Sequence, residues 1–231
     1  MSSRTVRIFI SSPGDVAEER QKAQQVIADL ARRYAPRLAL VPILWEELPL
    51  MADTPFQKGI ETVLDDKGGI DIAVFILWSR LGSPLGKKMR KPDGSPYRSG
   101  TEREWELMLA ARNESAQHTA PGEARPKILA YVRSDEAGFM HSLQAHGLRG
   151  DALEVALQQF NLARQFVREQ FHDAESGTNV GAYTEFGEPL TFAGRLRLHL
   201  RNLLDAMLPD AGPRVWDRPP YQGLEAFDVE H

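Results

Sequence analysis

The sequence predicts an α/β domain with a flavodoxin-like, doubly wound sheet of about five mostly parallel strands and helices on both faces. Short β-rich segments alternate with amphipathic helices, which is the pattern of right-handed β-α-β units. One strand segment, residues 70–78, is apolar almost throughout, as is typical of a central strand covered on both faces. The 231 residues are 42% hydrophobic, which is enough for a sizeable core.

The first β-α unit begins at residues 5–12, TVRIFISS, whose β-branched and aromatic residues predict a buried strand. A Ser-Ser-Pro-Gly turn ends this strand. Asp15 and Glu18 then match a D-x-x-E capping box, which predicts the start of a helix. The apolar positions of that helix follow the 3.6-residue period of one buried face: Val16, Ala23, Val26, Ile27, Leu30 and Tyr34.

The next two strands are predicted at 38–45 and 70–78, with a proline-rich loop and a short helix at about 55–66 between them. Residues 82–100 are rich in glycine and proline and predict a long loop, of the kind that usually carries function in a compact domain. This loop also holds a basic cluster: Lys87, Lys88, Arg90 and Lys91.

The remaining elements complete the alternation. A glutamate-rich helix begins near residue 100, and a fourth strand follows at 126–134. A helix at about 151–172 and a short edge strand within 178–186 come next, and the last helix covers about 190–208. We expect the strand order 2-1-3-4-5. The apolar faces of the last two helices are predicted to comprise Ala156, Phe160, Ala163, Val167 and Phe171, and Phe192, Leu196, Leu200, Leu203 and Met207.

Composition narrows the classes of function. The net charge of −4 argues against a general nucleic-acid binder. With no cysteine, the chain has no disulfides, thiol nucleophile or thiolate metal site, which suits a reducing cytoplasm. Its six histidines lack the spacing of a zinc site, so we expect no metal and no bound cofactor. We also expect no membrane segment, since the apolar run 72–78 is far too short to cross a bilayer.

One segment resembles a phosphate-binding loop but departs from its consensus sequence. RLGSPLGKK, residues 80–88, has three residues rather than four between Gly82 and Gly86. Lys88, rather than a hydroxyl residue, follows Lys87. We therefore interpret the basic loop as solvated rather than as an ATP-hydrolysing loop.

Three glutamates open the predicted helix of YRSGTEREWELMLAA, residues 97–111. Acids at a helix N-terminus are ordinary, because the helix dipole favours them there, and Glu102 suits this role. Glu106 lies about 200° around the helix from Glu104 and is predicted to face solvent. Ser99 or Thr101 would cap the helix. The helix start and the two turns after strands 5–12 and 70–78 should converge on one crevice at the carboxyl edge of the sheet.

Three motifs carry a resemblance to a known family. IFISSPGDVAEER (8–20), WSRLGS (78–83) and SGTEREWE (99–106) resemble a TIR-like domain of unknown function, found at the N-termini of STAND NTPases of the NACHT and WD40-repeat type. Trp78 stands where the family often has glycine and Leu81 where it often has tyrosine, so the turn motif is partly met. The residues that match the pattern are Asp15, Arg20, Gly82, Ser99, Thr101, Glu102 and Glu104.

The C-terminal segment carries a second resemblance. Residues 208–231 contain four prolines and no helical period, which predicts a linker or tail. PPYQGLEAFDVEH (219–231) is similar to the segment that introduces the nucleotide-binding domain of many bacterial STAND proteins. We therefore expect an effector domain at 1–209 and a linker at 210–231 toward a STAND nucleotide-binding domain.

The resemblance implies a site and an activity. TIR domains and nucleoside deoxyribosyltransferases place one catalytic glutamate at the start of a helix beside the central strand, which points to Glu104. Breaking an N-glycosidic bond builds positive charge on the ribose, and a carboxylate stabilises that charge. Substrate contacts are then expected from the backbone of the first turn, from residues bordering the base, and from the neighbouring turn and helix start: Ser11, Ser12, Gly14, Trp78, Arg80, Gly82, Ser99 and Thr101.

On this basis we expect a cytoplasmic NAD+ glycohydrolase that becomes active by self-association through a downstream STAND module, in bacterial innate immunity against phage. Two alternatives stay open. One is a non-catalytic TIR-like signalling or assembly module, and the other is a nucleoside or nucleotide N-glycosidase or transferase.

Overall fold

The computed structural model describes residues 3–44, 69–86, 89–173, 175–176 and 178–208. Within these residues the chain forms a five-stranded sheet in the order β2-β1-β3-β4-β5, with every neighbouring pair parallel. This confirms the predicted strand order and the doubly wound α/β class. The helix predicted at 55–66 and the linker predicted at 210–231 lie outside the described residues.

The central strand is the one that the sequence predicts. Ile72 of β3 is paired with Ile8 of β1 on one side and with Lys127 of β4 on the other. All six side chains of β3 are buried, since helices cover both of its faces. The strands are β1 (Arg4–Ser11), β2 (Leu38–Leu44), β3 (Ile72–Leu77), β4 (Lys127–Arg133) and the short edge strand β5 (Thr184–Phe186).

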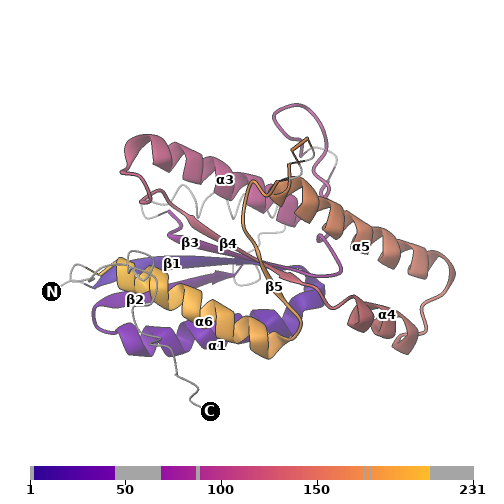
Figure 1. Ribbon diagram of the computed structural model, residues 1–231, viewed down its shortest axis with the longest axis horizontal. Coiled ribbons are helices and arrows are strands. Elements are labelled where there is room, and N and C mark those ends of the chain that lie inside the picture. Colours follow the sequence, from indigo (N-terminus) through magenta and orange to yellow (C-terminus); the bar gives the residue numbers. More distant parts are fainter. Residues whose placement is uncertain (1–2, 45–68, 87–88, 174, 177, 209–231) are drawn as a thin grey trace, which may run out of the picture.

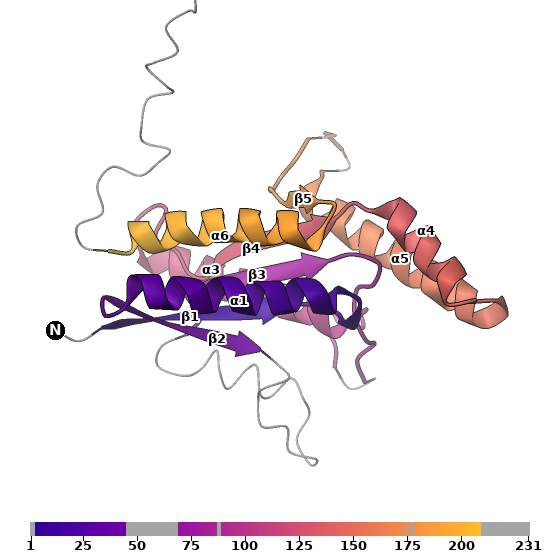
Figure 2. The ribbon, with the colours of Figure 1, turned by 90° about the horizontal axis from the view of Figure 1, so that it is seen from below.

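Helices form a layer on each face of the sheet (Figures 1 and 2). α1 (Ala17–Tyr34) and α6 (Pro189–Ala206) pack with one set of alternate side chains of β1 and β3. α3 (Gly100–His118) and α5 (Gly150–Phe171) pack with the other set, where Trp105 of α3 meets Phe75 of β3 at a ring distance of 4.9 Å. The core thus consists of two hydrophobic clusters, one on each face of the sheet.

The predicted capping box is wrong. A short 3-10 turn, η1 (Gly14–Val16), precedes α1, and Val16 occupies the cap position without a side-chain hydrogen bond. The Asp15 carboxylate turns away from the helix and accepts hydrogen bonds from the backbone N–H and the hydroxyl of Ser79, at 2.8 and 2.9 Å. The D-x-x-E pattern is present, but the Asp15 carboxylate accepts hydrogen bonds from Ser79, which is distant in the sequence, instead of capping α1.

A helix that the sequence analysis missed follows β4. α4 (Glu136–Ala145) is capped by Asp135, which accepts a hydrogen bond from the backbone N–H of Gly138 at 2.7 Å. Its Phe139 stacks on Phe160 of α5 with ring centroids 4.3 Å apart. Figures 1 and 2 show α4 and the start of α5 beyond the end of the sheet. Because the start of α5 lies beyond the sheet, Phe160 is only half-buried. Phe166, farther along α5, is fully buried and was not among the predicted apolar positions.

Candidate functional site

A pocket of about 510 Å³ lies at the carboxyl edge of the sheet. Three segments far apart in the sequence meet there, as the motifs predict: the turn after β1, the turn after β3 and the start of α3. The residues that line it are Ser12, Pro13, Gly14, Arg80, Gly82, Ser83, Pro84, Leu85, Gly86, Gly100, Thr101 and Glu104.

Glu104 is the fifth residue of α3 and lines this pocket, although only 5% of the residue is exposed. The Ser11 hydroxyl donates a hydrogen bond to its Oε2 at 2.5 Å. Ser11 is the last residue of β1, is fully buried and is not among the residues that line the pocket. The Ser11 side chain therefore holds the Glu104 carboxylate in place by a hydrogen bond. The sequence analysis instead expected Ser11 to contact a ligand.

The start of α3 is fixed by its cap and by a glycine. The Ser99 hydroxyl accepts a hydrogen bond from the backbone N–H of Glu102 at 3.1 Å, so Ser99, itself fully buried, is the helix cap and does not line the pocket. Gly82 has a φ of 112°, and a Cβ added there would lie 2.9 Å from the Thr101 hydroxyl oxygen. Only glycine suits that backbone conformation and that close approach, which brings the turn against Thr101.

The turn after β1 also lines the pocket. Arg20 of α1 holds it by donating from Nε to the Ser12 hydroxyl at 2.7 Å and from Nη2 to the carbonyl oxygens of Ser12 and Pro13 at 3.0 Å. The sequence analysis gave Arg20 no role. A signal was present, because a cation near a helix N-terminus faces an unfavourable dipole and therefore suggests a specific partner.

Trp78 does not line the pocket, although it was predicted to border a bound base. Its indole N–H donates to the Asp135 carbonyl oxygen at 3.1 Å, and the Arg133 guanidinium lies 4.1 Å from the ring centroid. Arg133 in turn contacts the buried Glu19 of α1 at 3.0 Å. These partners hold Trp78 against the core formed with α1 and α6. Of the two residues predicted beside the base, only Arg80 lines the pocket.

Glu102 and Glu106 have different surroundings from Glu104. Glu102 is 1% exposed and pairs with Arg98 at 2.7 Å and Lys91 at 2.9 Å. Burial is the largest single influence on its pKa and raises it, but the hydrogen bonds from Arg98 and Lys91 together outweigh burial and hold the pKa below its usual value. Lys91 also lies 2.7 Å from Glu106. Glu106 was predicted to face solvent, but it is half-buried and paired with this lysine.

The described residues hold no group of three or more histidine and acidic side chains that could bind a metal ion. None of the helices in the described part of the chain has both the length and the apolar composition that crossing a bilayer requires. Comparison of the chain with protein-family models, curated proteins and solved structures finds no match among any of them.

The pocket offers a defined chemistry. It presents one oriented carboxylate, one arginine side chain and the backbone of two turns, in a volume within the range of small-molecule sites. A carboxylate held in place beside a ligand can stabilise developing positive charge without reorganising during the reaction. This arrangement suits the cleavage of a bond whose transition state is cationic.

Proposed function

We propose that this chain is a TIR-like effector domain of a bacterial STAND immune receptor, which hydrolyses the nicotinamide–ribose bond of NAD+ in the cytoplasm when it oligomerises. The observation that carries the proposal is the position of Glu104. It lines a pocket at the carboxyl edge of a doubly wound sheet, near the start of the helix whose motif resembles that family. That edge is where ligands of such sheets generally bind.

The reaction needs little from the protein. The bond between ribose C1′ and the nicotinamide nitrogen breaks with its electron pair going to the ring, so the cationic nicotinamide leaves as a neutral molecule without a general acid. Water adds its oxygen to C1′ and releases one proton, which gives ADP-ribose. Glu104 stabilises the positive charge that develops on the ribose. The hydrogen bond from Ser11 keeps the carboxylate oriented before and during this step.

The lining of the pocket supports a nucleotide as the substrate. Arg80 supplies a cation, and the turn of Ser12 and Gly14 supplies backbone groups. A Cβ added at Gly14 would meet nothing within 4 Å, so this wall leaves space beside the turn. In the proposed complex these groups contact the phosphates and the ribose, while Gly82 and Thr101 shape the floor near the scissile bond.

The test is mass spectrometry of NAD+ incubated with the chain fused to a self-associating coiled coil. We expect nicotinamide and ADP-ribose from the wild type. Glu104→Gln keeps the size and polarity of the side chain and removes its charge, and it should lower the rate by about 10²–10³-fold, as the loss of a transition-state contact typically does. The matched control is Glu106→Gln, two residues farther along α3, which should keep most of the activity.

Two outcomes would contradict the proposal. Equal rates for the wild type and Glu104→Gln would remove Glu104 from the reaction. No cleavage of NAD+ by the wild type in any assembled state would favour a non-catalytic signalling module, and cleavage of free nucleosides instead would favour an N-glycosidase or transferase.

A further inference from the structure

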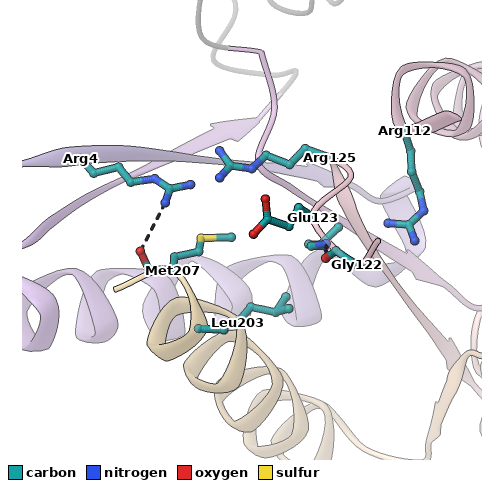
Figure 3. Close-up of a pocket in the computed structure, with 9 residues that line it drawn as sticks. Arg4, Arg112, Gly122, Glu123, Arg125, Leu203 and Met207 are labelled. Atoms are coloured by element: carbon teal, nitrogen blue, oxygen red, sulfur yellow. Dashed lines mark hydrogen bonds between the residues drawn. The ribbon is translucent and has the colours of Figure 1, made fainter. Parts of the chain in front are cut away.

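A second pocket, of about 610 Å³, lies at the opposite edge of the sheet, where β1 and β4 begin. Four of its lining residues are cationic, and they come from β1, α3 and the region where β4 begins. Figure 3 shows Arg4, Arg112 and Arg125 around the pocket, together with Glu123 and with Leu203 and Met207 at the end of α6. Its full lining is Arg4, Arg112, Gly122, Glu123, Arg125, Lys127, Leu203, Ala206 and Met207.

The two central arginines share one buried carboxylate. Arg125 Nη1 lies 2.5 Å from Asp71 Oδ1, and Arg4 Nη2 lies 3.9 Å from the same oxygen. Asp71 is 3% exposed and also accepts a hydrogen bond from the backbone N–H of Arg7 at 2.9 Å. In Figure 3 the guanidinium groups of Arg4 and Arg125 approach each other across the pocket. The single negative charge of Asp71 therefore holds two guanidinium groups close together but neutralises only one of their two positive charges.

Several donors in the pocket are only partly used. Arg4 Nη1 donates to the Met207 carbonyl oxygen at 3.3 Å, whereas Arg4 Nη2 is a buried atom with no hydrogen-bond partner in the described part of the chain. Arg112 Nη1 makes a long hydrogen bond of 3.4 Å to the Pro126 carbonyl oxygen. A buried N–H without an acceptor is costly, and an anion would supply one.

The charges of the lining select the kind of anion. Four cationic side chains stand against the carboxylates of Glu123 and Asp71, which leaves two positive charges in excess. The carboxyl end of α6 adds partial negative charge at Met207. The carboxylates and the helix end weaken the attraction for a ligand with a single negative charge. A compact anion with several negative charges is attracted most strongly by the four cationic side chains. Arginine forks also match phosphate oxygens in geometry.

From this we propose that the amino edge of the sheet binds a diphosphate group, either free or as part of a nucleotide, at Arg4, Arg112, Arg125 and Lys127. The site is separate from the pocket of Glu104 and does not depend on the function proposed for it. No aromatic side chain lines the pocket, so the diphosphate itself, rather than a stacked base, provides the affinity.

The experiment is titration calorimetry of the 231-residue chain with inorganic pyrophosphate and, in a second arm, ADP, at low and physiological salt. We expect saturable binding that weakens as salt is added. Arg4→Gln and Arg112→Gln should each weaken it by about tenfold or more, because each removes a charge-assisted hydrogen bond. Arg112→Gln keeps the test valid if Arg4→Gln fails to fold. Binding of ADP that is stronger than that of pyrophosphate and is weakened by Arg4→Gln and Arg112→Gln would identify a nucleotide at this pocket, and the reverse order a free diphosphate.

Two control variants separate this site from other effects. Arg149→Gln makes the same change of charge at an exposed position between α4 and α5 and should bind pyrophosphate as the wild type does. Arg168→Gln, at an exposed position of α5, should also bind it normally. Absence of binding by the wild type at millimolar pyrophosphate would overturn the proposal, as would equal binding by the wild type, Arg4→Gln and Arg112→Gln.

Discussion

Ser11 and Glu104 form a buried hydrogen bond between the end of the first strand and the start of a helix 93 residues later. Ser11→Ala would leave Glu104 Oε2 without this donor in a nearly inaccessible place. We expect the free energy of unfolding to fall by about 1–3 kcal/mol, the usual range for the loss of one hydrogen bond to a charged group. Glu104→Gln keeps an acceptor and should cost less. Urea denaturation measures both variants, and equal stability of Ser11→Ala and wild type would contradict the orienting role of Ser11.

Glu102 provides a prediction about pH. Its pKa in the folded chain lies below the ordinary value of 4.5. The unfolded chain therefore binds more protons between these two pKa values, and stability rises with pH through this range. The contribution of Glu102 is complete above about pH 5 and is lost as the pH falls through the folded-state pKa. Urea denaturation between pH 3 and 7 should show this loss.

The matched variants for this prediction are Glu102→Gln and Glu114→Gln. Glu102→Gln removes the titrating group, so its stability should change less with pH below 4.5 than that of the wild type. Glu114 is exposed on the same helix, and its replacement should leave the wild-type dependence on pH in place. An unchanged dependence on pH in Glu102→Gln would assign the acid sensitivity to other carboxyls.

Which glutamate faces the pocket could be predicted only in part. Helical spacing and the motif both favoured Glu104, and its carboxylate does line the pocket. The partners of Glu102 and Glu106 could not be predicted, because Lys91 reaches them from the preceding loop. Sequence spacing describes positions on one helix, whereas the direction in which a loop folds back depends on the whole arrangement.

Between elements, Arg133 joins β4 to α1 and to the turn after β3. It pairs with Glu19, which is 1% exposed, and lies over the Trp78 ring. Burial is the main influence that raises the Glu19 pKa, so removal of its cation leaves a carboxyl in an unfavourable place. Arg133→Met should lower the free energy of unfolding by about 3–5 kcal/mol, as the loss of one partner of a buried ion pair usually does.

The double variant Glu19→Gln/Arg133→Met tests the reason for this loss. It removes the isolated charge together with its partner, so it should be more stable than Arg133→Met alone. Chemical denaturation of the two variants and the wild type gives the comparison. A double variant as unstable as Arg133→Met would show that packing on Trp78, rather than the ion pair, carries the effect.

The elements with the strongest local signal were predicted best. Apolar runs such as β3 have a single way to be buried, and a parallel sheet supplies it. α4 was missed because its ten residues bury only Phe139 and Leu143, which is too short a pattern to identify a helix. The capping-box prediction was wrong because the Asp15 carboxylate accepts a hydrogen bond from Ser79. Ser79 is 64 residues away in the sequence, so a local sequence pattern could not indicate this contact.

For the whole molecule, the parallel sheet separates two kinds of site. The pocket at its carboxyl edge is lined by one carboxylate residue and two backbone turns. The pocket at its amino edge is lined by four cationic residues, of which Arg4 and Arg125 approach Asp71. The same three strands, β1, β3 and β4, lead from one edge to the other, with β3 buried along its whole length. The two pockets are thus built on one rigid centre, which suggests that each can be altered without unfolding the other.

The unequal burial of the elements predicts unequal stability across the molecule. β3 is paired on both sides and covered on both faces, so its amides should exchange with solvent only when the whole domain unfolds. α4 lies beyond the end of the sheet, packs mainly through Phe139 and Leu143, and leaves Met140 47% exposed. It should therefore open locally and exchange faster than β3 by orders of magnitude.

Hydrogen–deuterium exchange measured by NMR would resolve these elements separately. α6 is the matched comparison, because it is also a helix after the central strands but packs along α1 with Phe192, Leu196, Leu200 and Leu204 fully buried. We expect α6 to exchange nearly as slowly as β3 and α4 to exchange much faster than either. Equal protection of α4 and α6 would mean that α4 and the start of α5 unfold only together with the sheet, as part of one cooperative unit.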